Sequence, residues 1–405
     1  MAMKILLLTP DLPYPSESGA AIRNIGIIRG LSRAGHRVTL LSFAEHPPDM
    51  DSNPLYQLCD GVHAVPTPHH GKGKRIVKLL LTSRADMAFR LASEDFARAL
   101  TGILRGDWFD LIQFSGIELG CYLSFIQADK KKAKVVYDAL NAEAELQRVV
   151  ARVDRQRRRR WPAALYSTLQ SARLSQFEGA ICRDVDAVIA VSDEDRAHLI
   201  EHGGAPAFVM PNGISADDYA PPTDERREPF QLVFSGKMDY RPNVDAVEWF
   251  HESIFPLVRE QFPEARLVIV GRNPHRRLDS LDADMGVEVT GWVDSVQPYL
   301  HRATIYVAPL RMGSGTRLKI LQAMAARCAV VSTSIGAAGL NESVQSALSI
   351  ADEPEDFADK IVSLLADESR RRALGQLAQE HVRRHYDWSA LIPQLMRAYR
   401  EIGHG

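Results

Sequence analysis

Residues 309–325 have the sequence PLRMGSGTRLKILQAMA, which is typical of a strand end, a glycine-containing loop and the start of a helix. The strand is expected to end at Leu310, and the helix is expected to begin near Thr316. Glycine lets the backbone approach a ligand closely, and the free N–H groups of a first helical turn attract an anion. Arg317 and Lys319 add positive charge beside that turn. The stretch therefore predicts a diphosphate site, with a plain strand-to-helix turn as the alternative.

Short apolar runs alternate with helical patterns on both sides of this stretch. The strands expected in the first half are Ile5–Thr9, Val38–Phe43, Leu111–Phe114, Val135–Asp138 and Ala187–Ser192. Those expected in the second half are Leu232–Ser235, Leu267–Val270, Val287–Thr290, Ile305–Leu310 and Val330–Thr333. Helices are expected at Ala20–Arg33, Val244–Glu260, Thr316–Ala326, Pro354–Ala366 and Ser389–Ile402. This alternation predicts an α/β protein with two Rossmann-like, doubly wound parallel sheets.

The length of 405 residues exceeds the ~100–200 residues of one typical domain. Proline and Asn-Gly interrupt the pattern at Met210–Gly213, so the domain boundary is expected there. We expect an acceptor-binding domain over residues 1–208 and a donor-binding domain over residues 209–385. An amphipathic helix within residues 386–405 is expected to cross back to the first domain.

The composition is that of an ordinary soluble protein, with 45% apolar and 25% charged residues. A formal net charge of -2 excludes a global field that would attract nucleic acid or membrane. The apolar start of the chain is too short for a signal peptide, and no stretch has the ~18–20 uncharged residues of a membrane span. None of the four cysteines forms a CxxC pair, and Cys182 and Cys328 are expected to be buried. A cytoplasmic, soluble protein is the resulting prediction.

A second basic loop follows the first strand of the second half. There, Gly236 and Lys237 come directly after Ser235, in the sequence FSGKMDYRPN of residues 234–243. A lysine at the carboxyl end of a parallel strand can reach the crevice where open α/β sheets bind ligands. Neutralisation of a phosphate is therefore one interpretation of Lys237, and a solvated loop lysine is the other.

Taken together, these motifs resemble the group 1 (family 4) nucleotide-sugar glycosyltransferases of the GT-B fold. The resemblance also includes LPYPSESG at 12–19, PNG at 211–213, VGR at 270–272 and TGWV at 290–293. The block from Gly313 to Gly339 is its most specific part. The resemblance implies two domains that face each other across a cleft. It also implies sugar transfer with retention of the anomeric configuration, and no metal or cofactor.

The resemblance assigns roles along the chain. Gly19 is expected to face the donor phosphates, and Trp292 and Val293 are expected to flank the nucleobase. The expected donor-binding residues are Gly19, Gly236, Lys237, Arg272, Trp292, Val293, Gly313, Ser314, Gly315, Thr316, Arg317, Lys319 and Gln322.

Three positions depart from the family pattern. Ser314 and Gln322 stand where the family has two glutamates separated by seven residues. Pro242 stands where the family has a second phosphate-binding lysine. A glutamine carbonyl still accepts hydrogen bonds from ribose hydroxyls, but more weakly than a carboxylate. Two alternatives to the transferase therefore stay open: a catalytically weakened scaffold and a nucleotide-sugar epimerase of the same fold.

The acceptor is expected to bind polar side chains that follow strands in the first half. Glu118, Asp138, Asn141 and Glu143 are the candidates, with helix-start charges or caps as the alternative interpretation. The residues expected to take part in catalysis are Lys237, Ser314, Glu118 and Asn141. We find no histidine after Leu111–Phe114, where many family members have one, so no catalytic base is assigned.

Two basic clusters, Arg155–Trp161 and Lys72–Arg75, precede bulky apolar residues. Each basic residue near an anionic membrane contributes about 1 kcal/mol, and tryptophan suits the interface. The clusters predict contact with the inner face of a membrane, and a solvated face is the alternative. Nucleic acid is not expected as a partner, because no recognition fold accompanies the clusters. The expected function is a hexosyltransferase of polysaccharide biosynthesis that acts on a glycan or a lipid-linked acceptor.

Overall fold

The computed structural model describes residues 2–16, 18–69, 85–148, 161–201, 203–222, 226–273, 275–278, 281, 286–313 and 316–404. The chain forms two compact units, which are described separately. The N-terminal unit consists of Met1–Gly213 and Leu391–Gly405, and the C-terminal unit of Ile214–Ala390. Each unit is built on a parallel sheet that helices cover, so the predicted α/β class is confirmed. The cleft between the two halves stays a prediction.

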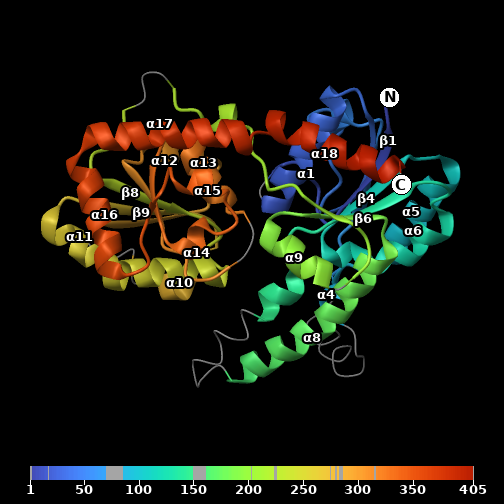
Figure 1. Ribbon diagram of the computed structural model, residues 1–405, viewed down its shortest axis with the longest axis horizontal. Helices are drawn as coiled ribbons and strands as arrows, with labels where there is room; N and C mark the ends of the chain where they lie inside the picture. The colour runs from blue at the N-terminus through green and yellow to red at the C-terminus, as the bar shows by residue number, and fades with distance from the viewer. Residues whose placement is uncertain are drawn as a thin grey trace. The chain divides into compact units, whose positions relative to one another are not determined.

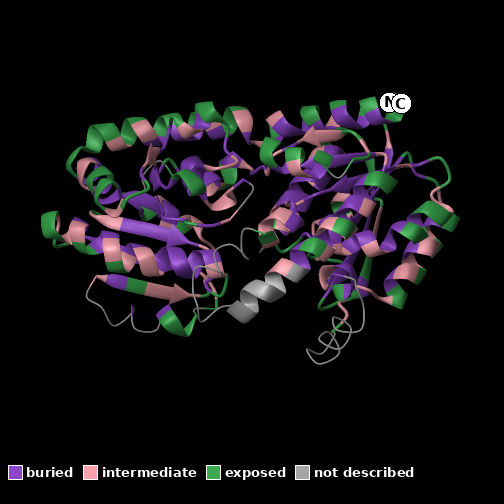
Figure 2. Cartoon of the chain, turned by 60° about the horizontal axis from the view of Figure 1, so that its bottom comes forward, coloured by how far each residue is buried: buried purple, intermediate pink, exposed green. Residues whose placement is uncertain are grey.

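The N-terminal unit contains a seven-stranded parallel sheet in the order β3-β2-β1-β4-β5-β6-β7. Its strands are β1 (Lys4–Thr9), β2 (Arg37–Ala44), β3 (Gly61–Pro66), β4 (Leu111–Ser115), β5 (Lys134–Asp138), β6 (Ala187–Ala190) and β7 (Ala207–Val209). The central strands are almost wholly buried, as expected when helices lie on both faces of a parallel sheet. Figure 2 shows these strands as buried and the outer faces of the helices as exposed.

The helices of this unit are α1 (Gly19–Arg33), α2 (Leu55–Leu58), α4 (Met87–Arg90), α5 (Glu94–Gly106), η1 (Ile117–Tyr122), α6 (Leu123–Asp129), α8 (Trp161–Asp184), α9 (Asp193–Glu201) and, from Leu391 on, α18 (Trp388–His404). In Figure 1, α18 lies beside α1. Close contact requires a glycine there, because a Cβ at Gly30 would lie 2.2 Å from Cγ1 of Ile392. The buried hydroxyl of Tyr399 also donates a hydrogen bond to Gln113 of β4. The last helix is thus part of the N-terminal unit.

The C-terminal unit contains a six-stranded sheet in the order β10-β9-β8-β11-β12-β13. Its strands are β8 (Gln231–Ser235), β9 (Arg266–Val270), β10 (Val287–Gly291), β11 (Ile305–Ala308), β12 (Ala329–Ser332) and β13 (Ser349–Ile350). Its helices are η3 (Ala216–Tyr219), α10 (Arg241–Trp249), a π-helical turn (Phe250–Ile254), α11 (Phe255–Gln261), η5 (Arg276–Leu278), α12 (Gln297–Arg302), α13 (Leu318–Ala325), α14 (Ser334–Ala337), α15 (Glu342–Gln345), α16 (Pro354–Ala366) and α17 (Glu368–His385).

Alternation along the strands divides the core of this unit into two layers. On β8, Leu232 and Phe234 pack with α10, α11 and α16, whereas Val233 packs on the opposite face with α12, α13 and α17. Figure 1 shows α10 and α16 on one side of β8 and β9 and α17 on the other. The first layer covers β9 and β10 as well, through Leu278 of η5. The two layers leave the carboxyl ends of β8, β9 and β11 to the loops that carry the predicted donor site.

Several predicted boundaries are wrong. The strand predicted to end at Leu310 ends at Ala308, because the amide of Leu310 turns back and donates to the carbonyl of Ala308 at 2.8 Å. The helix predicted from Val244 begins at Arg241, where Pro242 suits a first helical turn. Cys182 and Cys328 are buried, as predicted. The sequence patterns missed the strands β3, β7 and β13 and several helices, of which the longest are α5, α8, α9 and α17.

A buried arginine ties the N-terminal unit together. Arg23 of α1 has no exposed surface, and its guanidinium donates to both carboxylate oxygens of Asp138 at 2.7–3.2 Å. Its remaining nitrogen donates to the carbonyls of Met210 and Pro211 and to Oδ1 of Asn212 at 3.0–3.2 Å. Asp138, expected to contact the acceptor, is instead fully buried in this ion pair. The pair fixes α1, β5 and the end of the N-terminal segment against one another.

Replacing Arg23 tests the weight of this pair. Arg23→Met leaves the Asp138 carboxylate buried without a cation, and such a change costs about 3–5 kcal/mol of unfolding free energy. Arg37→Met removes an exposed partner of Asp60 and is the matched control, with an expected loss of at most about 1 kcal/mol. Urea unfolding of the N-terminal unit measures the loss of unfolding free energy in each variant. Equal losses in Arg23→Met and Arg37→Met would contradict the view that the buried ion pair stabilises the unit.

Candidate donor site in the C-terminal unit

Glycines let three loops meet at the carboxyl edge of the C-terminal sheet. Gly236 follows β8 and Gly271 follows β9, and both have positive φ angles, of 155° and 157°. A Cβ at Gly271 would lie 1.7 Å from the carbonyl oxygen of Gly236, so only glycine fits. The amide of Met238 donates to the carbonyl of Arg272 at 2.9 Å, which joins the same two loops. These contacts bring Gly236, Lys237 and Arg272 together, and their role in donor binding stays a prediction.

The predicted anion-binding turn begins α13. Residues 314–315, which include the predicted Ser314 and Gly315, lie outside the described residues. Within the described part of the chain, no acceptor is recorded for the amides of Leu318 and Lys319, the first two residues of α13. Such amides, at the positive end of the helix dipole, form a site for phosphate. Gly313 lies against Arg317, because a Cβ there would be 2.8 Å from a guanidinium nitrogen.

Lys319 connects this turn to the loop after β8. Its ammonium donates to Oδ1 of Asn243 at 2.6 Å and lies 4.5 Å from the ring centroid of Phe234. A Cβ at Gly236 would lie 2.6 Å from the same ammonium. Burial, with a smaller effect from the Arg317 guanidinium, lowers the pKa of Lys319 to about 7. Near neutral pH this side chain therefore exchanges between a neutral amine and a cation.

The other predicted donor residues have different surroundings. Lys237 is half-exposed, and its ammonium lies 3.4 Å from a carboxylate oxygen of Asp239. Gln322 donates to the hydroxyl of Tyr219 at 2.9 Å, so its carbonyl oxygen is left for another donor. Thr316 is buried and its hydroxyl donates to the carbonyl of Gly339 at 3.4 Å. Asn243 and Tyr219, which the sequence patterns did not single out, thus hold two of the predicted residues in place.

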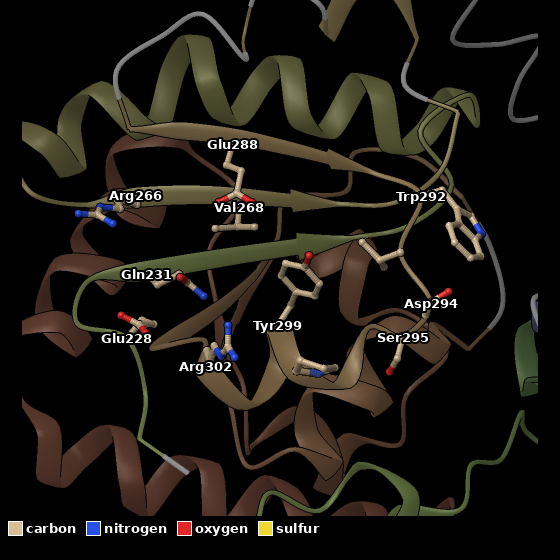
Figure 3. Close-up of a pocket in the computed structure, with 12 residues that line it drawn as sticks. Glu228, Gln231, Arg266, Val268, Glu288, Trp292, Asp294, Ser295, Tyr299 and Arg302 are labelled. Atoms are coloured by element: carbon tan, nitrogen blue, oxygen red, sulfur yellow. The ribbon is translucent and has the colours of Figure 1, made fainter.

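Trp292 and Val293 follow β10 and line a separate cavity of about 690 Å³. Figure 3 shows Trp292 at one end of this cavity and Arg266 at the other. Trp292 is 63% exposed, whereas Val293 packs partly against the core. The predicted position of the nucleobase is thus at the carboxyl-end mouth of the cavity. The cavity itself extends back along the strands toward their amino ends.

The predicted acceptor residues lie in the N-terminal unit. Asn141 donates to Oε1 of Glu143 at 3.0 Å. Gly19, which was predicted to face the donor phosphates, also lies in this unit and begins α1, whose cap is Ser18. Glu118 lies 4.0 Å from Arg90. Burial raises the pKa of Glu143 to about 7, and the carboxylates of Glu118 and Glu178 add to the shift.

Glu178 is a buried carboxylate that the sequence patterns did not single out. It accepts hydrogen bonds from the amides of Glu143 and Ala144 at 3.0 and 3.4 Å. Glu178 therefore fixes the backbone of the segment that carries Asn141 and Glu143. Asn141 and Glu143 follow β5 at the carboxyl edge of the sheet.

The predicted basic clusters lie almost wholly outside the described residues, so the predicted membrane contact stays a prediction. Residues 155–160 and 72–75 lie outside the described residues, and nothing is said of the Trp161 side chain. Among the described residues, no group of three or more His, Cys, Asp and Glu side chains could hold a metal ion. No helix in the described ranges is long and apolar enough to cross a membrane.

The two parallel sheets, with glycine-containing loops after the strands of the C-terminal unit, define an α/β protein with two Rossmann-like sheets. Two family models match the chain: the glycosyl transferase 4-like domain at residues 18–213 and glycosyl transferases group 1 at residues 229–367. The chain belongs to this family of glycosyltransferases, as the sequence motifs predicted.

Curated relatives agree with the family. The chain is 29% identical over 248 residues to the phosphatidyl-myo-inositol mannosyltransferase of Mycolicibacterium smegmatis, an alignment that covers 58% of this chain and 63% of that protein. It is 26% identical to the phosphatidylinositol N-acetylglucosaminyltransferase gpi3 subunit of Schizosaccharomyces pombe, with 54% and 49% covered. The chain thus aligns with less than two thirds of the length of either relative.

Solved structures show the same fold. Sucrose-phosphate synthase from Thermosynechococcus elongatus matches with a TM-score of 0.72 at 20% identity, over 99% of both chains. HepE of Anabaena, in complex with UDP and glucose, matches with a TM-score of 0.63 at 13% identity, over 98% of this chain and 100% of that one. At these identities the likeness shows the fold, which is GT-B as predicted.

Lys319 predicts a proton linkage. At pH 8 the free side chain is mostly neutral, because its pKa is about 7, and a bound diphosphate favours the ammonium form. Binding of UDP or GDP at pH 8 should therefore take up about half a proton or more, and affinity should fall as pH rises above 7. Calorimetry in two buffers of different ionisation enthalpy measures the uptake. Lys319→Met should abolish it, and binding without uptake in the parent protein would contradict the assignment.

Proposed function

We propose that the chain is a retaining hexosyltransferase that takes its sugar from a nucleotide-diphosphate sugar bound by the C-terminal unit. One observation carries the proposal. Lys319 lies between the loop after β8 and the first turn of α13, where Gly236 leaves room for its ammonium group. Group 1 membership supports the reaction class, and the complex of HepE with UDP and glucose supports the ligand class.

The proposed chemistry is electrostatic. Cleavage of the bond between the sugar and the diphosphate leaves negative charge on the leaving nucleoside diphosphate. Lys237, Arg317 and Lys319, together with the first amides of α13, would stabilise that charge. The three side chains are cations and the amides are hydrogen-bond donors, all supplied by the chain itself, so the proposal requires no metal or cofactor.

The acceptor is proposed to be a glycan or a lipid-linked glycan that binds the N-terminal unit near Glu118, Asn141 and Glu143. The named relatives act on phosphatidylinositol lipids, which makes a lipid acceptor and mannose the first substrates to test. A cytoplasmic position, free or at the inner face of a membrane, is part of this proposal. Its basis is the two basic segments at residues 72–75 and 155–161.

The first experiment separates the open functions. A donor panel of GDP-mannose, UDP-glucose and UDP-N-acetylglucosamine is incubated with the chain, with and without a phosphatidylinositol or glycan acceptor, and the products are followed by NMR. Transfer to the acceptor supports the proposal. An isomerised donor without acceptor would indicate the epimerase, and failure of UDP, GDP and ADP to bind at millimolar concentration would rule out both. The named relatives are transferases, which favours the first outcome.

Lys237 should contribute directly to diphosphate binding. Loss of one charged hydrogen bond costs about 1 kcal/mol or more, so Lys237→Ala should weaken UDP or GDP binding by at least about fivefold. The matched control is Lys360→Ala, which removes an exposed lysine of α16 and should leave binding unchanged. Equal affinities for the two variants in calorimetry would remove Lys237 from the site.

Gln322 decides between an active enzyme and a weakened scaffold. A carboxylate accepts ribose hydroxyls more strongly than an amide, so Gln322→Glu should raise donor affinity by up to about tenfold if the ribose lies there. The same change replaces the N–H that donates to Tyr219 by a carboxylate oxygen that accepts from the Tyr219 hydroxyl, and Tyr219→Phe controls for this change of partner. Transfer by the parent chain would reject the scaffold, and transfer only by Gln322→Glu would support it.

A further inference from the structure

On one face of the C-terminal sheet, the helices among the described residues pack against β9 but not against β10. Parallel sheets are normally covered on both faces by apolar packing. On this face the core layer of α12, α13 and α17 includes Val233, Val268 and Val270, but β10 contributes no residue to it. Glu288 of β10 and Arg266 of β9 are on this face, and both are exposed. The result is the cavity of about 690 Å³ shown in Figure 3.

The walls of this groove are built for hydrogen bonding. In Figure 3, Tyr299 and Arg302 rise from α12 toward the strands, and Gln231 lies beside Arg266 at the amino ends of β8 and β9. Within the part of the chain that the structure describes, no side-chain partner is recorded for Gln231, Arg266 or Glu288. Gln231, Arg266 and Glu288 thus line the same cavity and form no recorded side-chain hydrogen bond or ion pair with one another.

The charge and the volume of the groove indicate which class of ligand it can bind. Two arginines and three acidic residues line it, so the charges nearly cancel and neither a polyanion nor a polycation is favoured. Its volume lies within the range of about 300–1,000 Å³ typical of small-ligand sites. Trp292 presents an exposed ring at the mouth, and aromatic rings suit ligands with one apolar and one hydrated face. A sugar ring has such faces.

We infer that this groove binds a neutral oligosaccharide whose hydroxyls bond to Glu288, Gln231 and Arg266, with one end of the glycan beside Trp292 at the mouth. The site goes beyond the proposed function, because it would hold a glycan without any donor. The groove extends from the donor mouth toward the amino ends of the strands, so a glycan there occupies a region that the nucleotide does not need.

The competing explanation is protective. β10 is the edge strand of its sheet, and charged side chains on an edge prevent pairing with another chain. On that account, Arg266 and Glu288 serve only to prevent self-association. Changing them would then alter solubility and oligomeric state, with no effect on sugar binding.

The test uses the full chain labelled with 5-fluorotryptophan. The five tryptophans give five fluorine resonances, and Trp292→Phe assigns the one in the groove. Trp108, which is 58% exposed in the N-terminal unit, is the matched reporter outside the groove. Mannotetraose, maltotetraose and cellotetraose are titrated to about 20 mM, with and without saturating UDP or GDP. The inference predicts a saturable shift of the Trp292 resonance with at least one sugar, no shift of Trp108, and persistence of sugar binding with nucleotide bound.

Variants localise the binding. Arg266→Ala and Glu288→Gln should each weaken sugar binding by about fivefold or more, while nucleotide binding stays unchanged. Glu260→Gln alters an exposed glutamate on α11, which packs on the opposite face, and should change nothing. The inference is overturned if no tetrasaccharide shifts Trp292, if both groove variants bind as well as the parent, if nucleotide displaces the sugar, or if the variants change only self-association. Sugar binding by a chain that binds no nucleotide would separate failure of the proposed function from failure of this inference.

Discussion

The ammonium group of Lys319 is the contact on which the C-terminal site depends. It joins the start of α13 to the loop after β8 through Asn243, and it fits only because Gly236 has no side chain. The second phosphate-binding lysine of the family is absent, since Pro242 stands at its position, in the first turn of α10. A cation from a different element thus reaches the same loop. Burial lowers the pKa of Lys319 to about 7, so a phosphate that binds beside it also favours its protonated form.

Glycine at three strand ends is the structural condition for this arrangement. Gly236 and Gly271 approach each other too closely for any side chain, and Gly313 makes room for the guanidinium of Arg317. These positions lie where β8, β9 and β11 end, at the edge of the sheet where open α/β proteins bind their ligands. In the N-terminal unit, polar side chains follow a strand at the corresponding edge of the sheet. There Glu178 holds the segment that carries Asn141 and Glu143 at the end of β5.

The sequence patterns predicted most of the fold because apolar runs and helical spacing report burial directly. The five strands named in each half are present, and α16 has the predicted bounds. Strands β3, β7 and β13 were missed for a physical reason: they lie at sheet edges and are short or only partly buried, so they carry little apolar signal. The helix α17 was missed because its apolar residues are sparse among charged ones.

The site was predicted in outline, from glycines and cations that follow strands. Its supporting contacts were not, because Asn243, Tyr219 and Glu178 act across the fold and no local spacing reveals them. The burial of Asp138 could not be predicted for the same reason, since its partner Arg23 is 115 residues away in the sequence. Ordinary apolar patterning also gave no sign that one face of β10 is not covered by a helix among the described residues.

The most direct measurement is the response of two backbone amides, those of Leu318 and Lys319, in a chain labelled with ¹⁵N-leucine and ¹⁵N-lysine. If the first turn of α13 receives the diphosphate, both amide protons shift downfield on addition of UDP or GDP, while the amides of Leu257 and Lys360 keep their positions. A nucleoside diphosphate that binds without moving Leu318 or Lys319 would contradict the account.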